Sequence, residues 1–467
     1  MYKKVLFFVF EVLMFFCTVA QNSVTVRQPH MQNPAQKTII REYPSHYPST
    51  IACYDSDDSV TFVYYARNMQ VSEVTMKNCW VNDFVIYGDT VFFCGKSKTT
   101  RSGICGYFSI PDVFASNGDI AVIPILYSGN DSYHVKELTR ITTYPCADNT
   151  IRVVSIGYCV FRDTLPCLID INSYNHNPTY VGGYVDNEFE TFTDIKVVRN
   201  LHDEYYLVTA GFDTENGRYI NIRVYDPNNI FAPSGIQNRC HIYCIDTAAA
   251  RPWLDGGVLL TDLYNGNFVT VSYRSVPLDF DSNRDIVLSN ASIHIGIFSL
   301  DRIISNYVNA MQDNFEIPIG LLGNYEMDEI IYSNNRERVV FLHSYSTLLN
   351  MASDFCCFNP HTLQNSGTLL AHQNIGIKQQ GLSLYNNRNN YILSGFKMAT
   401  PTEINYEMET FGISSSCVST KEYNYERKHI VNSLNTTREF IYRGHVSEII
   451  KPTLYRADLP LYIDCER

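Results

Sequence analysis

The sequence has little of what several common protein classes require. Its 36 Lys and Arg are outnumbered by 48 Asp and Glu, which gives a net charge of −12. An acidic surface repels phosphate backbones, so this balance argues against nucleic-acid binding. Beyond the N-terminal segment, no stretch approaches the ~20 apolar residues that a membrane-spanning helix needs. No Pro-, Gly- or Ser-rich linker divides the chain, which favours one domain over two.

Short catalytic motifs are also missing. The sequence contains no HExxH, no GxSxG and no glycine loop of the kind that cradles phosphates. We therefore predict no cofactor and no metal, and the catalytic residues, if there are any, stay unknown at this stage. What the chain does have is aromatic residues, with 34 Tyr and 26 Phe. Such a composition favours strands over helices.

The N-terminus, MYKKVLFFVFEVLMFFCTVA, has the pattern of a secretory signal peptide. Lys3 and Lys4 precede a short apolar run, and small residues lead to Ala20, after which we expect cleavage. A membrane anchor is the alternative, but the run is short and Glu11 interrupts it. We therefore expect residues 1–20 to be removed, no transmembrane segment to remain, and the protein to be exported to the periplasm, the cell surface or the medium.

Export permits disulfide bonds. Cys17 would leave with the signal peptide, so 13 of the 14 cysteines remain, an odd number. Cys94 with Cys105, and Cys159 with Cys167, each lie on two apolar runs joined by a polar turn. Facing strands would bring each pair close enough to form a disulfide. The alternative is that they are small buried core residues.

One pattern recurs along the chain: an apolar run, a polar turn, and a second apolar run that ends on a small residue. It begins with VNDFVIYGDTVFFCG at 81–95 and recurs at a mean spacing of about 60 residues. Further strand-like runs follow most of these hairpins, with the alternation of half-buried strands. The second runs end at Gly95, Gly157, Gly211, Tyr273, Ser344 and Gly395.

This repetition predicts an all-β protein, a β-propeller with blades of three to four antiparallel strands. A further hairpin at 51–78 precedes the first unit, which makes seven blades our expectation, with six or eight as alternatives. Residues 21–48 contain four prolines and are predicted to be an extended lead-in, and 49–467 a single propeller domain. Late strands near the C-terminus are candidates for closing the ring. Residues 300–314 are the best helix candidate. A pair of β-sandwich domains is the competing architecture.

Known propeller types are excluded by their own signatures. Two tryptophans cannot supply the Trp-Asp pairs of WD40 blades or the Asp-and-Trp turns of sialidase repeats, and paired glycines are too few for kelch units. The stretch 79–110, CWVNDFVIYGDTVFFCGKSKTTRSGICGYFSI, resembles uncharacterised secreted proteins of gut Bacteroidales. These have a signal peptide, then NDF, a strand ending in FCG and a GYF strand. The resemblance implies a propeller-like fold and export, and brings no catalytic residues.

Three acidic residues occupy a corresponding place in the repeat. Asp83, Asp194 and Asp328 begin the first strand of three units. Glycosidase propellers place two or three carboxylates around the axis, so these residues are candidates for an acid and a base or nucleophile. Their recurrence favours a structural role, in which each carboxylate binds backbone N–H groups at the strand start.

Other clusters are weaker candidates for chemistry. DFDSNRD places Asp279, Asp281, Asn283 and Asp285 at alternate positions, but Arg284 and Asn290 stand where a calcium loop needs Gly and a carboxylate, which favours a plain turn. YDSDDS at 54–59 most resembles a hairpin turn. The remaining candidates are cysteine pairs, for which disulfide bonds or core packing are the favoured interpretations over a metal site or a redox switch: Cys240 and Cys244 with His241 between them, and adjacent Cys356 and Cys357.

Two functions from different classes follow. The first is an exported, non-catalytic binding or scaffolding protein that recognises a glycan or protein through loops on one propeller face, using its many tyrosines. The second is a carbohydrate-active hydrolase or lyase with carboxylates at the axis. Because no catalytic motif is present, we favour binding.

Overall fold

We describe the protein from a computed structural model. The structure describes residues 25–464 except for 29–36, 45–47, 56–58, 67–70, 126–133, 146–150, 161–163, 173–178, 182–183, 186–189, 214–218, 226–235, 244–256, 281–285, 306–309, 323, 347–350, 376, 386–389, 401–402, 412–418, 428–430, 435–439, 442–450 and 460–461. The predicted signal peptide and most of the DFDSNRD turn, residues 281–285, lie outside the described residues.

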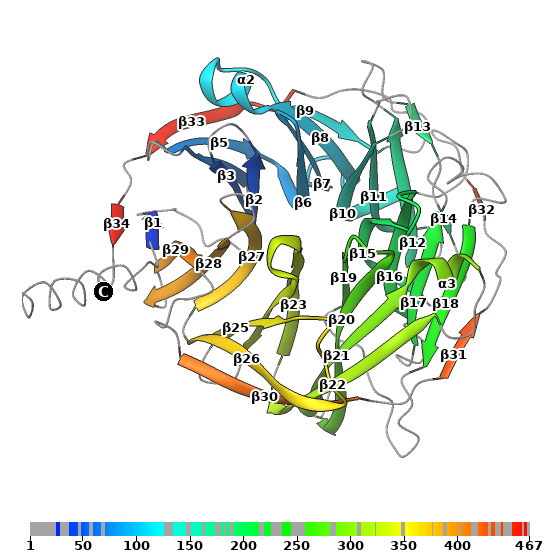
Figure 1. Ribbon diagram of the computed structural model, residues 1–467. Coiled ribbons are helices and arrows are strands. Elements are labelled where there is room, and N and C mark those ends of the chain that lie inside the picture. Colours follow the sequence, from blue (N-terminus) through cyan, green and yellow to red (C-terminus); the bar gives the residue numbers. More distant parts are fainter. Residues whose placement is uncertain are drawn as a thin grey trace, which may run out of the picture.

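The chain forms small antiparallel sheets arranged as a ring around a central axis (Figure 1). Three sheets have five strands. They are β2 (Lys37–Pro44), β3 (Pro48–Asp55), β4 (Ser59–Tyr65), β5 (Val71–Lys77) and β33 (Leu454–Leu459); β15 (Glu190–Arg199), β16 (Tyr205–Asp213), β17 (Tyr219–Tyr225), β18 (Ile236–Tyr243) and β31 (Val431–Leu434); and β27 (Ile377–Tyr385), β28 (Asn390–Thr400), β29 (Glu403–Phe411), β1 (Thr25–Gln28) and β34 (Tyr462–Asp464).

Two sheets have four strands, and one pairing has two. The four-stranded sheets are β6 (Cys79–Tyr87), β7 (Thr90–Ser97), β8 (Gly103–Ser109) and β9 (Ala121–Pro124); and β10 (His134–Pro145), β11 (Ile151–Val160), β12 (Thr164–Asn172) and β13 (Thr179–Val181). The two-stranded pairing joins β14 (Tyr184–Val185) to β32 (Phe440–Ile441).

The remaining strands form one nine-stranded sheet that contains two consecutive four-strand meanders. The first is β19 (Val258–Asp262), β20 (Asn267–Phe280), β21 (Ile286–Ser299) and β22 (Met311–Leu322), and the second is β23 (Asn324–Ser333), β24 (Arg338–Ser346), β25 (Met351–Phe358) and β26 (Ser366–Ile375). Strand β30 (Ser419–Arg427) pairs with both β22 and β26 and so joins the meanders. The protein is therefore all-β and propeller-like, with five separate blade-sized sheets rather than the seven separate blades expected, because β30 makes one sheet of these two meanders.

The first strands of the meanders surround the axis. They contact one another in the cyclic order β2, β6, β10, β15, β19, β23, β27 and back to β2. Neighbouring sheets pack face to face through apolar side chains. Between the first two sheets, Phe62 of β4 contacts Phe84, Phe93 and Phe108, with ring centroids 5.0 to 5.9 Å apart. Each sheet thus buries both faces against its neighbours, as the repeat predicts.

The small residue that ends each repeat has a structural cause. In β6, β10 and β15 one residue bulges out of the pairing, and the residue opposite the start of the bulge is Gly95, Gly157 or Gly211. A Cβ atom at these glycines would lie 1.8, 2.0 and 1.6 Å from the carbonyl oxygens of Trp80, Glu137 and Thr191 in the facing strand. Side chains cannot fit there, so the repeated glycine marks the repeated bulge.

The C-terminal part of the chain runs around the outside of the ring. Strand β30 lies between two meanders, β32 pairs with β14, and β31, β33 and β34 are the last strands of three five-stranded sheets (Figure 1). We call this segment, residues 419–464, the C-terminal belt. It covers sheet edges that would otherwise offer unpaired backbone groups to other chains.

Two predictions of detail need correction. Residues 21–48 contribute β1 and β2 to two sheets, so the propeller begins before residue 49. The helix expected at 300–314 is only α3 (Leu300–Ile304), because residues from Met311 onward pair with β21 instead. The other described helices are α2 (Ile110–Ala115) and a 3-10 turn at Asn334–Arg336. Among the described residues, no helix has the length and apolar character needed to cross a bilayer.

Candidate functional site

Charged side chains from four first strands meet at the axis of the ring. The residue that directly follows the bulge is Asp83 in β6, Arg140 in β10, Asp194 in β15 and Glu329 in β23. All four side chains are largely buried, with 1% of Asp83, 11% of Arg140, 1% of Asp194 and 4% of Glu329 exposed. The bulge therefore turns the same position of each strand toward the axis. We call these four residues, together with Arg41 and Lys196, the axial cluster.

Two of the acids connect neighbouring sheets in the same way. One carboxylate oxygen of Asp83 accepts from the N–H of Phe84 at 2.9 Å, and the other accepts from Ile141 in the next sheet at 3.2 Å. Asp194 repeats this with Ile195 at 2.9 Å and Leu260 at 2.8 Å. Each carboxylate thus closes the bulge in its own strand and binds the first strand of the following unit.

The bulged residues make further bonds across the same boundaries. The Asn82 side-chain amide donates to the carbonyl of Leu138 at 2.7 Å. The Thr193 hydroxyl donates to the carbonyl of Val258 at 2.7 Å and accepts from its N–H at 2.9 Å. Positions 82–83 and 193–194 are therefore equivalent structural connections between neighbouring sheets, and this supports the structural role expected for the recurring acids.

Glu329 is the centre of the axial cluster. Its carboxylate lies 2.8 Å from Arg41 Nη2, 3.6 Å from Arg140 Nη1 and 4.0 Å from Lys196 Nζ. The same Arg41 nitrogen lies 2.9 Å from Asp83. Three cations and three anions from β2, β6, β10, β15 and β23 thus form one network that joins sheets from opposite sides of the ring.

The electrostatics of the cluster favour ionised Glu329. Burial alone would raise its pKa, but Arg41, Lys196 and Arg140 outweigh burial and lower the pKa to about 2. Asp194 differs, because burial raises its pKa and Lys196 and Arg140 offset this only in part. Glu329 is a carboxylate held charged by its partners. A general acid needs the opposite, a carboxyl that keeps its proton near neutral pH.

The sequence identified two of the three axial acids, although they lie in the middle of β6 and β15 and not at the strand starts expected. Asp83 and Asp194 lie in the cluster, whereas the residue equivalent to them in β23 is Glu329 and not Asp328. Asp328 occupies the bulge itself, and its carbonyl accepts from Arg140 Nη2 at 3.2 Å. The cations were missed, although Arg140 stands at the same position of its repeat as the acids. Arg41 was missed because it lies in the segment expected to be a lead-in.

A second arrangement lies where two hairpin turns meet, at β15–β16 and β19–β20. Tyr205 and Tyr264 are 41% and 43% exposed and Leu201 is 69% exposed. The guanidinium carbon of Arg199 lies 6.0 Å from the ring centre of Tyr205 and 5.3 Å from that of Tyr264. We call these four residues the tyrosine patch. Aromatic rings held by a cation–π contact present a stable, amphipathic surface.

Asp262 connects the two turns of the patch through hydrogen bonds. Asp262 accepts from the N–H of Tyr264 at 2.9 Å and from the N–H of Arg199 at 3.3 Å. Tyr264 has a positive φ of 59°, which this local bond helps to maintain. Burial raises the pKa of Asp262 to about 6, against the hydrogen bonds that lower it. The two turns are therefore fixed relative to each other, and the tyrosine patch is one continuous surface.

Four of the cysteine candidates are buried core residues. Cys94, Cys105, Cys159 and Cys167 belong to one buried core cluster between the sheets of β6–β9 and β10–β13. Cys94 lies directly opposite Cys105 in the pairing of β7 and β8. The two expected disulfides are not confirmed, and their residues act as the small core side chains of the alternative interpretation.

The remaining candidates give no catalytic arrangement. In β25, Cys356 is buried and Cys357 partly exposed, as side chains on opposite faces of a strand must be. Asp279 lies in β20, but residues 281–285 fall outside the described part, as does Cys244. Within the described residues, no group of three or more His, Cys, Asp or Glu could hold a metal ion.

Comparison with known proteins adds little. No family model matches the chain, and no curated protein matches it. Among solved structures, one match is a "putative dipeptidyl aminopeptidase IV" from Bacteroides ovatus, 12% identical, with a TM-score of 0.31. The alignment covers 79% of this chain and 51% of that one, so this chain spans about half of its length. We carry no activity across at this similarity. The resemblance to secreted proteins of gut Bacteroidales stays a prediction.

Proposed function

We propose that this is an exported, non-catalytic protein that binds a glycan through one face of the propeller. The observation that carries the proposal is the tyrosine patch, where two half-exposed tyrosines flank Arg199 on adjacent hairpin turns. Sugar rings stack on aromatic faces, and the phenol hydroxyls and guanidinium supply hydrogen bonds to sugar hydroxyls. Tyrosine offers this contact area at low cost in conformational entropy.

The axial cluster supports binding over hydrolysis. Asp83 and Glu329 are close enough to share one nitrogen of Arg41, so their nearest oxygens lie within about 6 Å, a spacing that glycosidases use. Yet both carboxylates are paired with the cation between them. Glycoside hydrolysis needs one protonated carboxyl and room for a sugar between the pair. The cluster has instead the form of a structural ion network.

A glycan array tests the proposal directly. The mature protein is expected to bind a limited set of glycans, and the double variant Tyr205→Ala, Tyr264→Ala is expected to lose most of that signal. Tyr87→Ala is the matched control, because Tyr87 is also a strand-end tyrosine with 42% exposure but lies in β6. Equal loss in the control and the double variant would contradict a role for the patch.

Parallel hydrolysis assays separate the proposed binding function from the enzyme alternative. We expect no release of reducing ends from any glycan that the array identifies. Release that disappears in Glu329→Gln, while that variant stays folded, would overturn the non-catalytic proposal and place the chemistry at the axis.

A further inference from the structure

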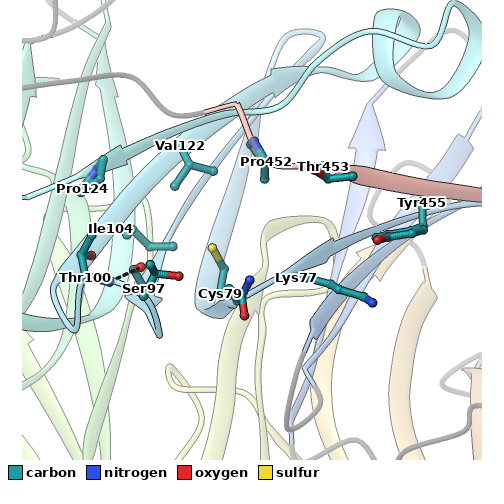
Figure 2. Close-up of a pocket in the computed structure, with 12 residues that line it drawn as sticks. Lys77, Cys79, Ser97, Thr100, Ile104, Val122, Pro124, Pro452, Thr453 and Tyr455 are labelled. Atoms are coloured by element: carbon teal, nitrogen blue, oxygen red, sulfur yellow. Dashed lines mark hydrogen bonds between the residues drawn. The ribbon is translucent and has the colours of Figure 1, made fainter.

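A cavity of about 310 Å³ lies at the rim of the ring, between the sheet of β6–β9 and the C-terminal belt (Figure 2). This volume is at the small end of the range for ligand sites. The cavity is lined by the β5–β6 junction, the β7–β8 turn, parts of β8 and β9, and the start of β33 with the residues before it. It involves none of the residues of the axial cluster or of the tyrosine patch.

The lining combines an apolar wall with a row of neutral polar groups. The wall is formed by Cys79, Ile104, Val122, Pro124 and Pro452, and the polar groups are Asn78, Ser97, Thr99, Thr100, Thr453 and the hydroxyl of Tyr455. Hydroxyls both donate and accept, which suits a ligand that itself carries several hydroxyls. A cavity with one apolar face and several hydroxyl groups is suited to bind a single sugar ring.

The charge of the cavity has one sign. Among the described residues that line it, Lys77 is the one with a charged side chain, and none is a carboxylate. The Lys77 ammonium lies 4.7 Å from the ring centre of Tyr455 at the edge of the cavity. Such a cation–π contact holds the ammonium at the outer edge of the cavity, beside Tyr455, without neutralising it (Figure 2).

Further cations stand close by in the chain. Lys96 and Lys98 lie 5.4 and 4.3 Å from the ring centre of Trp80, which follows the cavity residue Cys79. On the belt side, Arg456 donates to the carbonyl of Gly118. Lys96 also lies 3.8 Å from Glu137, and Lys451, next to the cavity residue Pro452, lies 2.7 Å from Asp119, so Lys77 is the cation that the cavity itself presents to an anionic ligand.

We propose that this cavity binds a sugar acid of one ring, a hexuronate, with the ring against the apolar wall, its hydroxyls on the Ser and Thr side chains, and its carboxylate on Lys77. The site is distinct from the tyrosine patch and does not depend on the proposed function. Because Pro452, Thr453 and Tyr455 belong to the C-terminal belt, the bound ligand also fastens the belt to the sheet of β6–β9.

Calorimetric titration of the mature protein with D-glucuronate tests the proposal, with D-glucose as the neutral probe. D-glucuronate is expected to bind, more tightly than D-glucose, and to weaken as salt is added. Lys77→Gln keeps the length of the side chain and is expected to weaken D-glucuronate about tenfold, as for loss of a charged hydrogen bond. Thr453→Val is expected to weaken both sugars. Lys136→Gln, on exposed Lys136 of β10, is the matched control.

A second readout locates the ligand. D-glucuronate is expected to slow hydrogen exchange at the amides of β33, which the belt contributes beside the cavity. Absence of D-glucuronate binding, equal affinity for D-glucose, or undiminished binding by Lys77→Gln would each overturn the proposal. Protection that spares β33 would do the same. The tyrosine-patch variants should leave this titration unchanged, so failure here and failure on the glycan array are separate results.

Discussion

Ion pairs occur both at the axis and at the rim of the ring, but they are buried at the axis and exposed to water at the rim. At the axis, Glu329 is 4% exposed and meets three cations from three other strands. At the rim, Lys451 and Asp119 are 70% and 62% exposed and form an ion pair at 2.7 Å. Water screens the second pair but not the first. The axial charges therefore hold the sheets in place, whereas the belt depends on backbone pairing to sheet edges.

The largest expected effect comes from removing the central charge at the axis. Glu329→Gln leaves three cations close together without their shared partner, which should reduce the free energy of unfolding by about 3–5 kcal/mol. Urea denaturation measures this. Exposed Glu337, at the end of the 3-10 turn before β24, gives the control Glu337→Gln, expected to change stability by less than about 0.5 kcal/mol. Similar losses in both variants would contradict the central role of Glu329.

Wild type and Glu329→Gln can also be compared as a function of pH. The pKa of Glu329 is about 2 in the folded protein and 4.5 as its ordinary value, so the folded state favours the ionised form. Its contribution is complete above pH 4.5 and declines as pH falls toward 2. The stability difference between wild type and Glu329→Gln should therefore shrink below about pH 4.5. A difference that stays constant down to pH 3 would show that its source is not the charge.

The second largest effect concerns the bulge that positions the axial acids. In Gly211→Ala the new Cβ would lie 1.6 Å from the carbonyl oxygen of Thr191, so the backbone must move. We expect a loss of more than about 2 kcal/mol in the free energy of unfolding. Gly88→Ala is the matched change, because a Cβ there meets nothing within 4 Å and only the positive φ of 56° opposes it. Its cost should stay near about 1 kcal/mol.

These residues also show what the sequence can predict. The recurring glycine was visible because the bulges in β6, β10 and β15 leave no room for a side chain opposite them, and the acid because Asp83 and Asp194 each close such a bulge. The third acid was predicted to be Asp328 and not Glu329, because a bulge adds a residue that no periodic pattern reveals. In the same unit the residue opposite the start of the bulge is buried His343, where the sequence suggested Ser344. That unit carries no glycine signal with which to correct the alignment.

The belt shows what the sequence does not contain. Its strands follow no repeat, because each one adds to the edge of a sheet formed long before it in the chain. The pairing of β33 with β5, from Leu454↔Met76 to Leu459↔Val71, joins residues almost 400 positions apart. Late strands were expected, but not that they follow the rim. The tyrosine patch was missed for a similar reason, since it depends on two turns whose neighbourhood only the ring creates.

A smaller effect is expected at the tyrosine patch. Burial raises the pKa of Asp262 to about 6 from an ordinary 3.8, so the folded state favours the protonated form. Its contribution to stability is complete below pH 3.8 and is lost as pH rises through about 6. The carboxyl carbon of Asp262 should titrate near pH 6 by nuclear magnetic resonance. A midpoint near 3.8 would show that the patch is more open to water than its packing indicates.

The smallest effect is expected at the rim. Lys451→Ala removes an exposed pair with Asp119 that water already screens, so the urea midpoint should not shift measurably. Hydrogen exchange of the β33 amides should also be unchanged, because those amides are held by pairing with β5 and not by the side chain of Lys451. Faster exchange in β33 would show instead that this ion pair holds the belt in place, and that axis and rim depend on charge alike.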